Sequence, residues 1–183
     1  QPIRVECTDK VQLITCRTIN SALWFVNNKR LEYLLLAYLA KYVEKYGVLL
    51  YAFVIVGNHY HMMAKFPLGH RSEFFRDFNA RVAQAVKRCV PQFLGGPLFE
   101  RRFTPQVLVL DDDVKTYFFY CALQSVSSGL CINIADYPDY NSFQDAASGI
   151  SRKFRLFSYG KFNAAKRFNP HVKIGDFECE YLL

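Results

Sequence analysis

Two histidines are spaced so that they could hold one metal ion. His59 and His61 follow the apolar run that ends at Gly57, and Tyr60 separates them. Successive side chains of a β-strand point to opposite faces, so both imidazoles would lie on one face, about 7 Å apart along the strand at roughly 3.3 Å per residue. Imidazole is a common ligand of divalent metals. Alternatively, the two histidines are only polar residues on a half-exposed strand. Other residues of the chain must decide between a metal site and this simpler explanation.

A second pair of polar residues lies further along the chain, on a predicted helix. Tyr120 and Gln124 are four residues apart, which places them on one helix face with about 5–6 Å between their Cβ atoms. The amide oxygen of Gln124 is a reasonable third ligand beside two imidazoles. The Tyr120 hydroxyl could then attack a phosphodiester that the metal polarises, leaving a phosphotyrosine link.

Tyr117 is the alternative nucleophile, one turn earlier on the same helix face. It lies seven residues from Gln124, roughly 10 Å at 1.5 Å of rise per residue, so it is poorly placed for a metal held by that amide. We therefore expect Tyr120 to be the nucleophile. Without the two histidines, aromatic residues on this helix would be better explained as part of the hydrophobic core.

Hydrophobic periodicity predicts the elements that must position these residues. The predicted strands are 11–19, 48–56, 59–66 and 106–110, of which 48–56 is apolar on both faces, as a central strand covered on both sides would be. The predicted helices are 28–46, 72–90 and 111–128. The first six elements form a βαββαβ unit, so we predict an α+β protein with a ferredoxin-like core. The third helix would pack near the open sheet face, to which the histidines point.

Composition and charge limit the class of protein. The chain has 183 residues and a formal net charge of +7, which suits one domain that binds nucleic acid or another anionic partner. The sequence contains no apolar run of the 18 or more residues that a membrane span needs, and no visible signal peptide. Six cysteines are scattered without Cys-x-x-Cys spacing, which favours a reduced, cytoplasmic compartment.

Basic residues alternate with aromatic residues near the C-terminus. Residues 151–175 contain seven Lys or Arg residues and no Asp or Glu, and such a mixture suits single-stranded nucleic acid, because cations contact phosphates and rings stack on bases. Alternatively, the rings pack on the core and only the cations face solvent. The candidate nucleic-acid contacts across the chain are Arg17, Arg81, Lys87, Arg88, Arg101, Arg102, Lys161, Lys166 and Arg167.

Two of these segments resemble motifs of a known family. Residues 58–61, Asn-His-Tyr-His, resemble the His-hydrophobic-His motif of HUH endonucleases. Residues 120–124, Tyr-Cys-Ala-Leu-Gln, resemble the single-tyrosine helix of the transposases of that superfamily. The chain most resembles the REP-associated tyrosine transposases, and the resemblance covers roughly residues 11–145. Within this range, further similar segments lie at 47–53, 99–103 and 125–130. A weaker similarity extends over residues 155–168.

The resemblance implies a catalytic domain over residues 1–145 and a basic, aromatic C-terminal extension over 146–183 that packs on it. It implies metal-dependent nicking and joining of single-stranded hairpin or repeat DNA, in which the tyrosine becomes joined to the 5′ phosphate. Carried onto this chain, the catalytic residues are Tyr120, His59 and His61, and the metal ligands are His59, His61 and Gln124. The family also implies Mg or Mn as the metal. It leaves the oligomeric state open between monomer and homodimer.

The chain departs from the family pattern at two places. Relatives often carry Asn-Pro-x-Arg where residues 124–127 read Gln-Ser-Val-Ser. Glutamine keeps an amide ligand there, but the missing arginine puts a DNA contact in doubt. Gly57 also differs from the residue expected before the histidine motif. Two other functions compete with a transposase: a domesticated DNA-binding protein that no longer cleaves, and an unrelated metal hydrolase acting on a small substrate.

Overall fold

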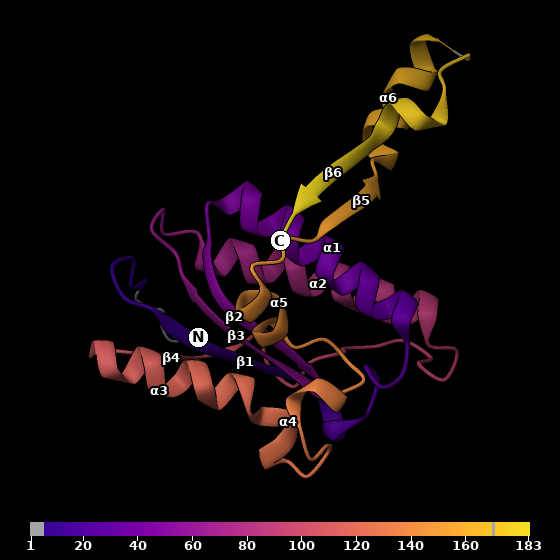
Figure 1. The fold of residues 1–183 in the computed structure, drawn as a ribbon. Helices are drawn as coiled ribbons and strands as arrows, with labels where there is room; N and C mark the ends of the chain where they lie inside the picture. The colour runs from indigo at the N-terminus through magenta and orange to yellow at the C-terminus, as the bar shows by residue number, and fades with distance from the viewer. Residues whose placement is uncertain (1–5, 170) are drawn as a thin grey trace.

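An antiparallel sheet with the strand order β2-β3-β1-β4 forms the centre of the molecule (Figure 1). The computed structural model describes residues 6–169 and 171–183, so the first five residues of the predicted catalytic segment and Pro170 lie outside the description. The strands are β1 (Gln12–Arg17), β2 (Leu49–Val56), β3 (His59–Lys65) and β4 (Thr104–Val107). Together with two crossover helices they make the predicted ferredoxin-like βαββαβ unit, which confirms the fold prediction.

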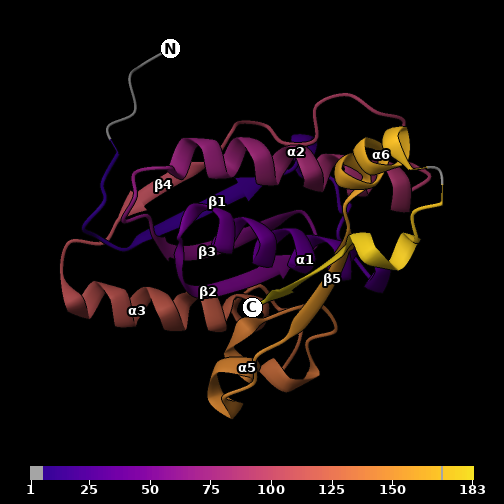
Figure 2. The same cartoon turned by 90° about the horizontal axis from the view of Figure 1, so that it is seen from above.

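The two crossover helices, α1 (Lys29–Tyr46) and α2 (Arg71–Cys89), lie side by side on one face of the sheet (Figure 2). Local sequence sets the ends of α1. The Asn28 side chain accepts a hydrogen bond of 2.9 Å from the Leu31 N–H, and Gly47 ends the helix with a φ of 59°. The apolar stripes of both helices and the inner face of the sheet form the larger hydrophobic core, which buries many phenylalanine and leucine side chains.

The helix that carries Tyr120 covers the other face of the sheet. Helix α3 (Asp111–Ala122) begins where the Asp113 carboxylate accepts a hydrogen bond of 3.1 Å from the Leu110 N–H, and it packs on β2 and β3. A second apolar cluster, which includes Val54, Met63 and Cys121, fills the space between this helix and the sheet. The histidine-bearing face is therefore covered as predicted.

The prediction of one continuous helix over 111–128 is wrong. Helix α3 stops at Ala122, and a short helix, α4 (Gln124–Ser127), follows after Leu123. The buried side chain of Asn141 donates a hydrogen bond of 2.8 Å to the Ala122 carbonyl. That carbonyl would accept from the residue four positions later in an unbroken helix, so the bond from Asn141 takes the place of a helical bond.

Two predictions about strands also need correction. Strand β2 lies at the edge of the sheet, and only its residues 52–56 are buried on both faces, since Leu49 and Tyr51 are exposed. At this edge the Ile55 N–H donates to the Tyr140 carbonyl and the Phe53 N–H donates to the Ser142 hydroxyl. An apolar strand can therefore lie at an edge, because a later segment of the chain covers its free backbone groups. The strand predicted at 106–110 is at Thr104–Val107, since pairing with β1 rather than side-chain type sets its ends.

The C-terminal residues form an arm that projects from the body (Figure 1). After α5 (Ser142–Ser148), β5 (Lys153–Phe157) and β6 (Glu178–Leu182) form a hairpin that encloses α6 (Tyr159–Phe168). The hairpin rests on α1, where buried Phe154 lies 5.5 Å from the ring of Tyr33. Short 3-10 turns, η1 (Ile19–Ser21), η2 (Ile134–Asp136) and η3 (Ile174–Phe177), complete the chain. Within the described residues, no helix is both long and apolar enough to cross a membrane.

The bond between Asn141 and Ala122 gives a stability prediction. We expect Asn141→Ala to lower the free energy of unfolding by about 2 kcal/mol, because it removes a buried hydrogen bond and the side chain that caps the first turn of α5. Urea unfolding followed by circular dichroism measures the change. Asn133→Ala is the control, since this exposed side chain contacts only Asp136 and should cost less than about 0.5 kcal/mol. Equal losses in both variants would contradict the proposed role of Asn141.

Candidate functional site

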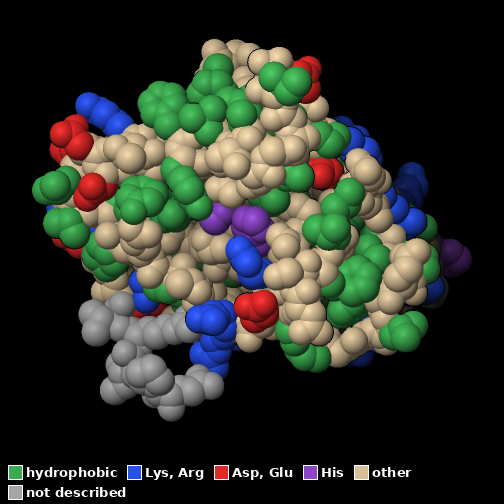
Figure 3. Space-filling view, turned by 90° about the horizontal axis from the view of Figure 1, so that it is seen from below, with side chains coloured by type: hydrophobic (Ala, Val, Ile, Leu, Met, Phe, Trp, Pro, Cys, Tyr) green, Lys and Arg blue, Asp and Glu red, His purple; other side chains and the backbone are tan. Residues whose placement is uncertain are grey.

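The two histidines meet at the start of β3. Antiparallel pairing places Arg17 opposite His59 and Thr15 opposite His61. The Nε2 atoms of the two imidazoles are 3.0 Å apart, and both side chains are largely buried. Figure 3 shows the histidine side chains at the base of a hollow on the face of the molecule formed by α3 and the loops around it.

Each imidazole is held through its other ring nitrogen. The Nδ1 atom of His59 lies 2.6 Å from the Asn58 Oδ1 atom, and the Nδ1 atom of His61 lies 2.8 Å from the Thr15 hydroxyl. Because an amide oxygen can only accept, His59 carries its proton on Nδ1 and leaves the Nε2 lone pair free. Such contacts orient imidazoles that bind metals.

The imidazoles stay neutral at physiological pH. Burial, and to a smaller extent the nearby Arg17 guanidinium, lower the pKa of His59 to about 4. Burial, His59 and Arg17 together lower the pKa of His61 to about 3. The His61 imidazole has two arrangements: it can donate from Nε2 to the His59 Nε2 lone pair while its Nδ1 accepts from the Thr15 hydroxyl, or it can carry its proton on Nδ1 and leave both Nε2 lone pairs for a cation. The pair therefore has both the charge state and the arrangement of two ligands of one ion.

Tyr120 lies in the same pocket, which has a volume of about 560 Å³ and is also lined by Arg17 and Gln124. The ring of Tyr120 packs edge-on against His61 with 5.6 Å between ring centroids, and the residue is 44% exposed. The phenol is therefore accessible to a ligand in the pocket. The neighbouring Cys121 is buried, and burial raises the pKa of its thiol to about 12, so this thiol is not an available nucleophile.

Tyr117 has a different environment from Tyr120. Its hydroxyl accepts a hydrogen bond of 2.6 Å from the Gln106 side-chain amide on β4, and it does not line the histidine pocket. The two tyrosine rings are 6.0 Å apart, so they are neighbours on α3. Of the two phenols, Tyr120 is the one that shares a pocket with the imidazoles.

Gln124 supplies an unpaired acceptor. Its Nε2 donates a hydrogen bond of 3.1 Å to the Ser128 hydroxyl, whereas its Oε1 atom is buried and has no hydrogen-bond partner among the described residues. A buried amide oxygen without a donor costs free energy unless something else binds it. Since the described residues contain no group of three or more His, Cys, Asp or Glu suited to a metal, an ion at the imidazoles needs a donor of this other type. Two nitrogens and one oxygen fit Mn or a similar divalent ion.

The pocket contains residues that sequence reasoning missed. Thr15 orients His61, and only the register between β1 and β3 reveals it. The loop after η2 closes one side, where the Tyr137 hydroxyl donates a hydrogen bond of 2.7 Å to the Ile55 carbonyl. Asp139 in this loop also lines the pocket, and burial together with the charge of Glu32 raises its pKa. Local sequence patterns do not reveal this role, because the contact partner of Tyr137 is 82 residues away in the chain.

The predicted cations do not surround one site. Only Arg17 lines the histidine pocket, while Arg101 and Arg102 line a second pocket beside α2. The remaining candidates are exposed, on α2 at Arg81, Lys87 and Arg88, and on α6 in the arm at Lys161, Lys166 and Arg167. Helix α2 covers the face of the sheet opposite to α3, so these residues could contact DNA only at a distance from the imidazoles.

Comparison with known proteins relates this fold to transposases. No protein-family model matches the chain, and no curated protein is similar to it at a significant level. Among solved structures, a REP-associated tyrosine transposase bound to a REP hairpin aligns with 82% of this chain and 87% of its own, with a TM-score of 0.67 and 16% identity. A candidate transposase from Deinococcus radiodurans R1 aligns with 70% of this chain and 96% of its own at 14% identity, with a TM-score of only 0.44. The chain has the fold of a REP-associated tyrosine transposase.

Proposed function

We propose that this protein is a metal-dependent transposase that nicks and joins single-stranded DNA through a covalent 5′-phosphotyrosine intermediate. The observation that supports this proposal is one pocket that contains Tyr120, the two neutral imidazoles and the unpaired amide oxygen of Gln124. These groups come from three separate elements, β3, α3 and α4. Their meeting around one cavity provides a nucleophile and a candidate cation site in the same place.

His59, His61 and Gln124 would hold a divalent ion, Mg or Mn. When bound, such an ion neutralises phosphate oxygens and stabilises the charge that develops during phosphoryl transfer. Magnesium prefers oxygen-rich sites, so the two nitrogen ligands favour manganese in direct comparison.

Residues of the chain perform the transfer itself. The Arg17 guanidinium in the pocket would contact the phosphate and hold it next to Tyr120. The phenolic oxygen of Tyr120 attacks the phosphorus, a phosphotyrosine bond forms, and the bond to the 3′ oxygen breaks. The 3′ oxygen leaves as a hydroxyl after taking up a proton, and the phenol loses its proton to solvent, to which Tyr120 is exposed. In the joining step a 3′ hydroxyl attacks the phosphotyrosine and releases the phenol.

Hairpin or repeat DNA is the proposed substrate. The solved structure with the same fold is bound to a REP hairpin. The net charge of +7 and the exposed cations of α2 and α6 suit a nucleic acid longer than the strand that enters the pocket. A domesticated protein of this fold that binds DNA without cleaving it is the alternative.

Replacing the nucleophile tests the proposal. We expect Tyr120→Phe to abolish the protein–DNA adduct, because the ring stays and only the attacking oxygen is lost, while affinity for DNA changes little. The assay mixes the protein with a panel of labelled hairpin oligonucleotides and manganese and then searches a denaturing gel for a shifted band. Tyr117→Phe is the matched control and should keep the adduct, since its hydroxyl contacts Gln106 outside the pocket.

Three other results of this assay would change the assignment. An adduct that persists in Tyr120→Phe but disappears in Tyr117→Phe would move the nucleophile to Tyr117. Binding without an adduct across the whole panel, in the unaltered protein, would favour the non-cleaving alternative. Cleaved DNA without attached protein would instead favour a metal hydrolase that uses water.

The metal site makes a separate prediction. Thr15→Val should weaken Mn²⁺ binding about 10–100-fold, because it removes the hydroxyl that orients the imidazole of His61. His61→Gln should abolish detectable binding, since only one imidazole remains. Isothermal titration calorimetry of the DNA-free protein measures both. Thr104→Val, at the exposed position opposite Thr15 on β4, is the control and should bind Mn²⁺ normally. Normal binding by Thr15→Val would show that the hydroxyl does not support the site.

A further inference from the structure

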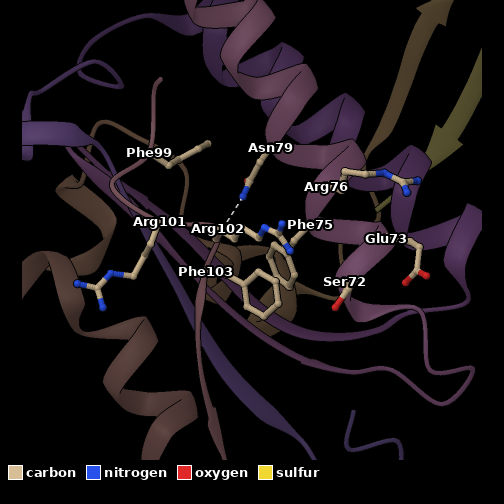
Figure 4. A pocket seen from close by; sticks show the side chains of 9 residues that line it. All are labelled: Ser72, Glu73, Phe75, Arg76, Asn79, Phe99, Arg101, Arg102 and Phe103. Carbon is tan, nitrogen blue, oxygen red and sulfur yellow. Dashed lines mark hydrogen bonds between the residues drawn. The ribbon is translucent and has the colours of Figure 1, made fainter. Parts of the chain in front are cut away.

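A second cavity lies on the other side of the sheet edge from the histidine pocket. It has a volume of about 530 Å³ and lies between the first half of α2 and the segment 99–103 that leads into β4. Figure 4 shows its side chains, which come from these two segments only. Nothing in the phosphotyrosine mechanism uses this cavity, although its size suits a small organic group.

Aromatic rings form much of its lining. Phe75 and Phe103 stack with 4.6 Å between ring centroids and an interplanar angle of 29°, and both are buried. Phe99 is only partly buried, so it offers a ring to the cavity. Rings in such a position can stack on the flat face of a nucleobase, whatever its identity.

Cations stand at the edge of the same cavity. Arg101 and Arg102 are exposed and form no ion pair with the described acidic residues, whereas Arg76 pairs with Asp77. In Figure 4 the Arg102 side chain crosses the cavity and Arg101 points away from it. Two unpaired guanidiniums beside an aromatic wall suit phosphates on either side of a bound base.

Polar groups in the cavity limit which base fits. The Asn79 amide is already engaged, because it donates to the Arg102 carbonyl and accepts from the Tyr60 hydroxyl. The Ser72 hydroxyl and the Glu73 carboxylate remain without hydrogen-bond partners among the described residues. A carboxylate accepts from the exocyclic amino group of cytosine, adenine or guanine, so these bases would be preferred over thymine.

The cavity is connected to the histidine pocket through the backbone. The Glu100 N–H donates a hydrogen bond of 3.0 Å to the carbonyl of Arg17, and Thr18 forms a β-bridge with Phe99. Arg17 lines the histidine pocket, while Phe99 and Arg101 line the second cavity. The residues that line the two pockets are therefore joined by direct backbone contacts at the end of β1, on which a path for a single strand from Arg17 to Arg101 would depend.

We propose that the cavity binds one unpaired nucleotide of the DNA strand that flanks the cleaved phosphate. Its base stacks on Phe99, and Arg101 and Arg102 contact the adjacent phosphates. This inference rests on the proposed DNA-nicking function and adds a site that holds the strand in register. Glu73 would make the site selective for a base with an amino group.

Binding by the uncleavable Tyr120→Phe protein tests the site apart from the chemistry. The probes are a fixed hairpin with single-stranded flanks of random sequence, and the same stem without flanks. We expect the double variant Arg101→Ala, Arg102→Ala to bind the flanked probe about tenfold more weakly or worse. The slope of its log binding constant against log salt concentration should fall in magnitude by about 2. Binding of the bare stem should change little. Arg30→Ala/Lys115→Ala removes the same charge at exposed positions outside both pockets and is the control.

A cross-linking experiment identifies the stacked base directly. Flanks that contain 5-iodocytosine are irradiated in the complex, and we expect mass spectrometry to find the cross-link on Phe99. Phe99→Leu keeps an apolar side chain against the core, so the melting temperature should fall only slightly, yet the cross-link should vanish and affinity fall about tenfold. Glu73→Gln should reduce the preference for flanks with cytosine, adenine or guanine over thymine.

Several results would overturn the inference. The first is a set of cross-links confined to the histidine pocket or the arm. The second is an equal loss of affinity for the flanked probe and the bare stem in the Arg101/Arg102 double variant. The third is a loss of affinity in that variant no larger than in the Arg30/Lys115 control. Each leaves the proposed function intact if the protein with Tyr120 still forms its adduct. Failure of the adduct with normal cross-linking at Phe99 would instead contradict the proposed chemistry and keep the nucleotide site.

Discussion

The contact between the two imidazoles is the interaction on which the rest of the site depends. Their Nε2 atoms are 3.0 Å apart, and burial keeps both rings neutral. Asn58 and Thr15 contact the opposite ring nitrogens and fix the orientation of both rings. In the proposed function, the folded sheet would hold the two Nε2 atoms in place before an ion binds, which is the preorganisation of a metal site.

A single hydrogen bond from the C-terminal half of the chain shapes the other side of the site. Asn141 binds the Ala122 carbonyl, and α3 ends there. The turn at Leu123 starts a new helix whose first residue is Gln124. This residue lines the cavity, and its buried amide oxygen has no hydrogen-bond partner among the described residues. The same Asn141 region covers the free edge of β2. The segment after α4 therefore covers the edge of the sheet and sets the end of α3 through the same contacts.

In the proposed function, the edge of the sheet lies between the pocket where DNA is cleaved and the cavity where a flanking nucleotide binds. The imidazoles and Tyr120 lie on the side covered by α3, while the aromatic cavity lies on the side covered by α2. Residues 98–100 run along the end of β1 and join the two sides. Because β1 also carries Thr15 and Arg17, a strand bound in the cavity would be aligned by the same element that orients His61. Rigid elements position reacting groups better than loops do.

The amino-acid sequence was sufficient to predict the ferredoxin-like unit and the grouping of His59, His61, Tyr120 and Gln124, since both depend on local periodicity and on two short motifs. It was not sufficient for features that depend on contacts between distant residues. The break at Leu123 requires Asn141, the orientation of His61 requires the register of β1 against β3, and β2 can lie at an edge only because residues 140–142 cover it. The placement of Arg17 in one pocket and of Arg101 and Arg102 in another also depends on contacts between distant residues. Periodicity shows which face of an element is buried, but only the packed chain decides which residue lies opposite.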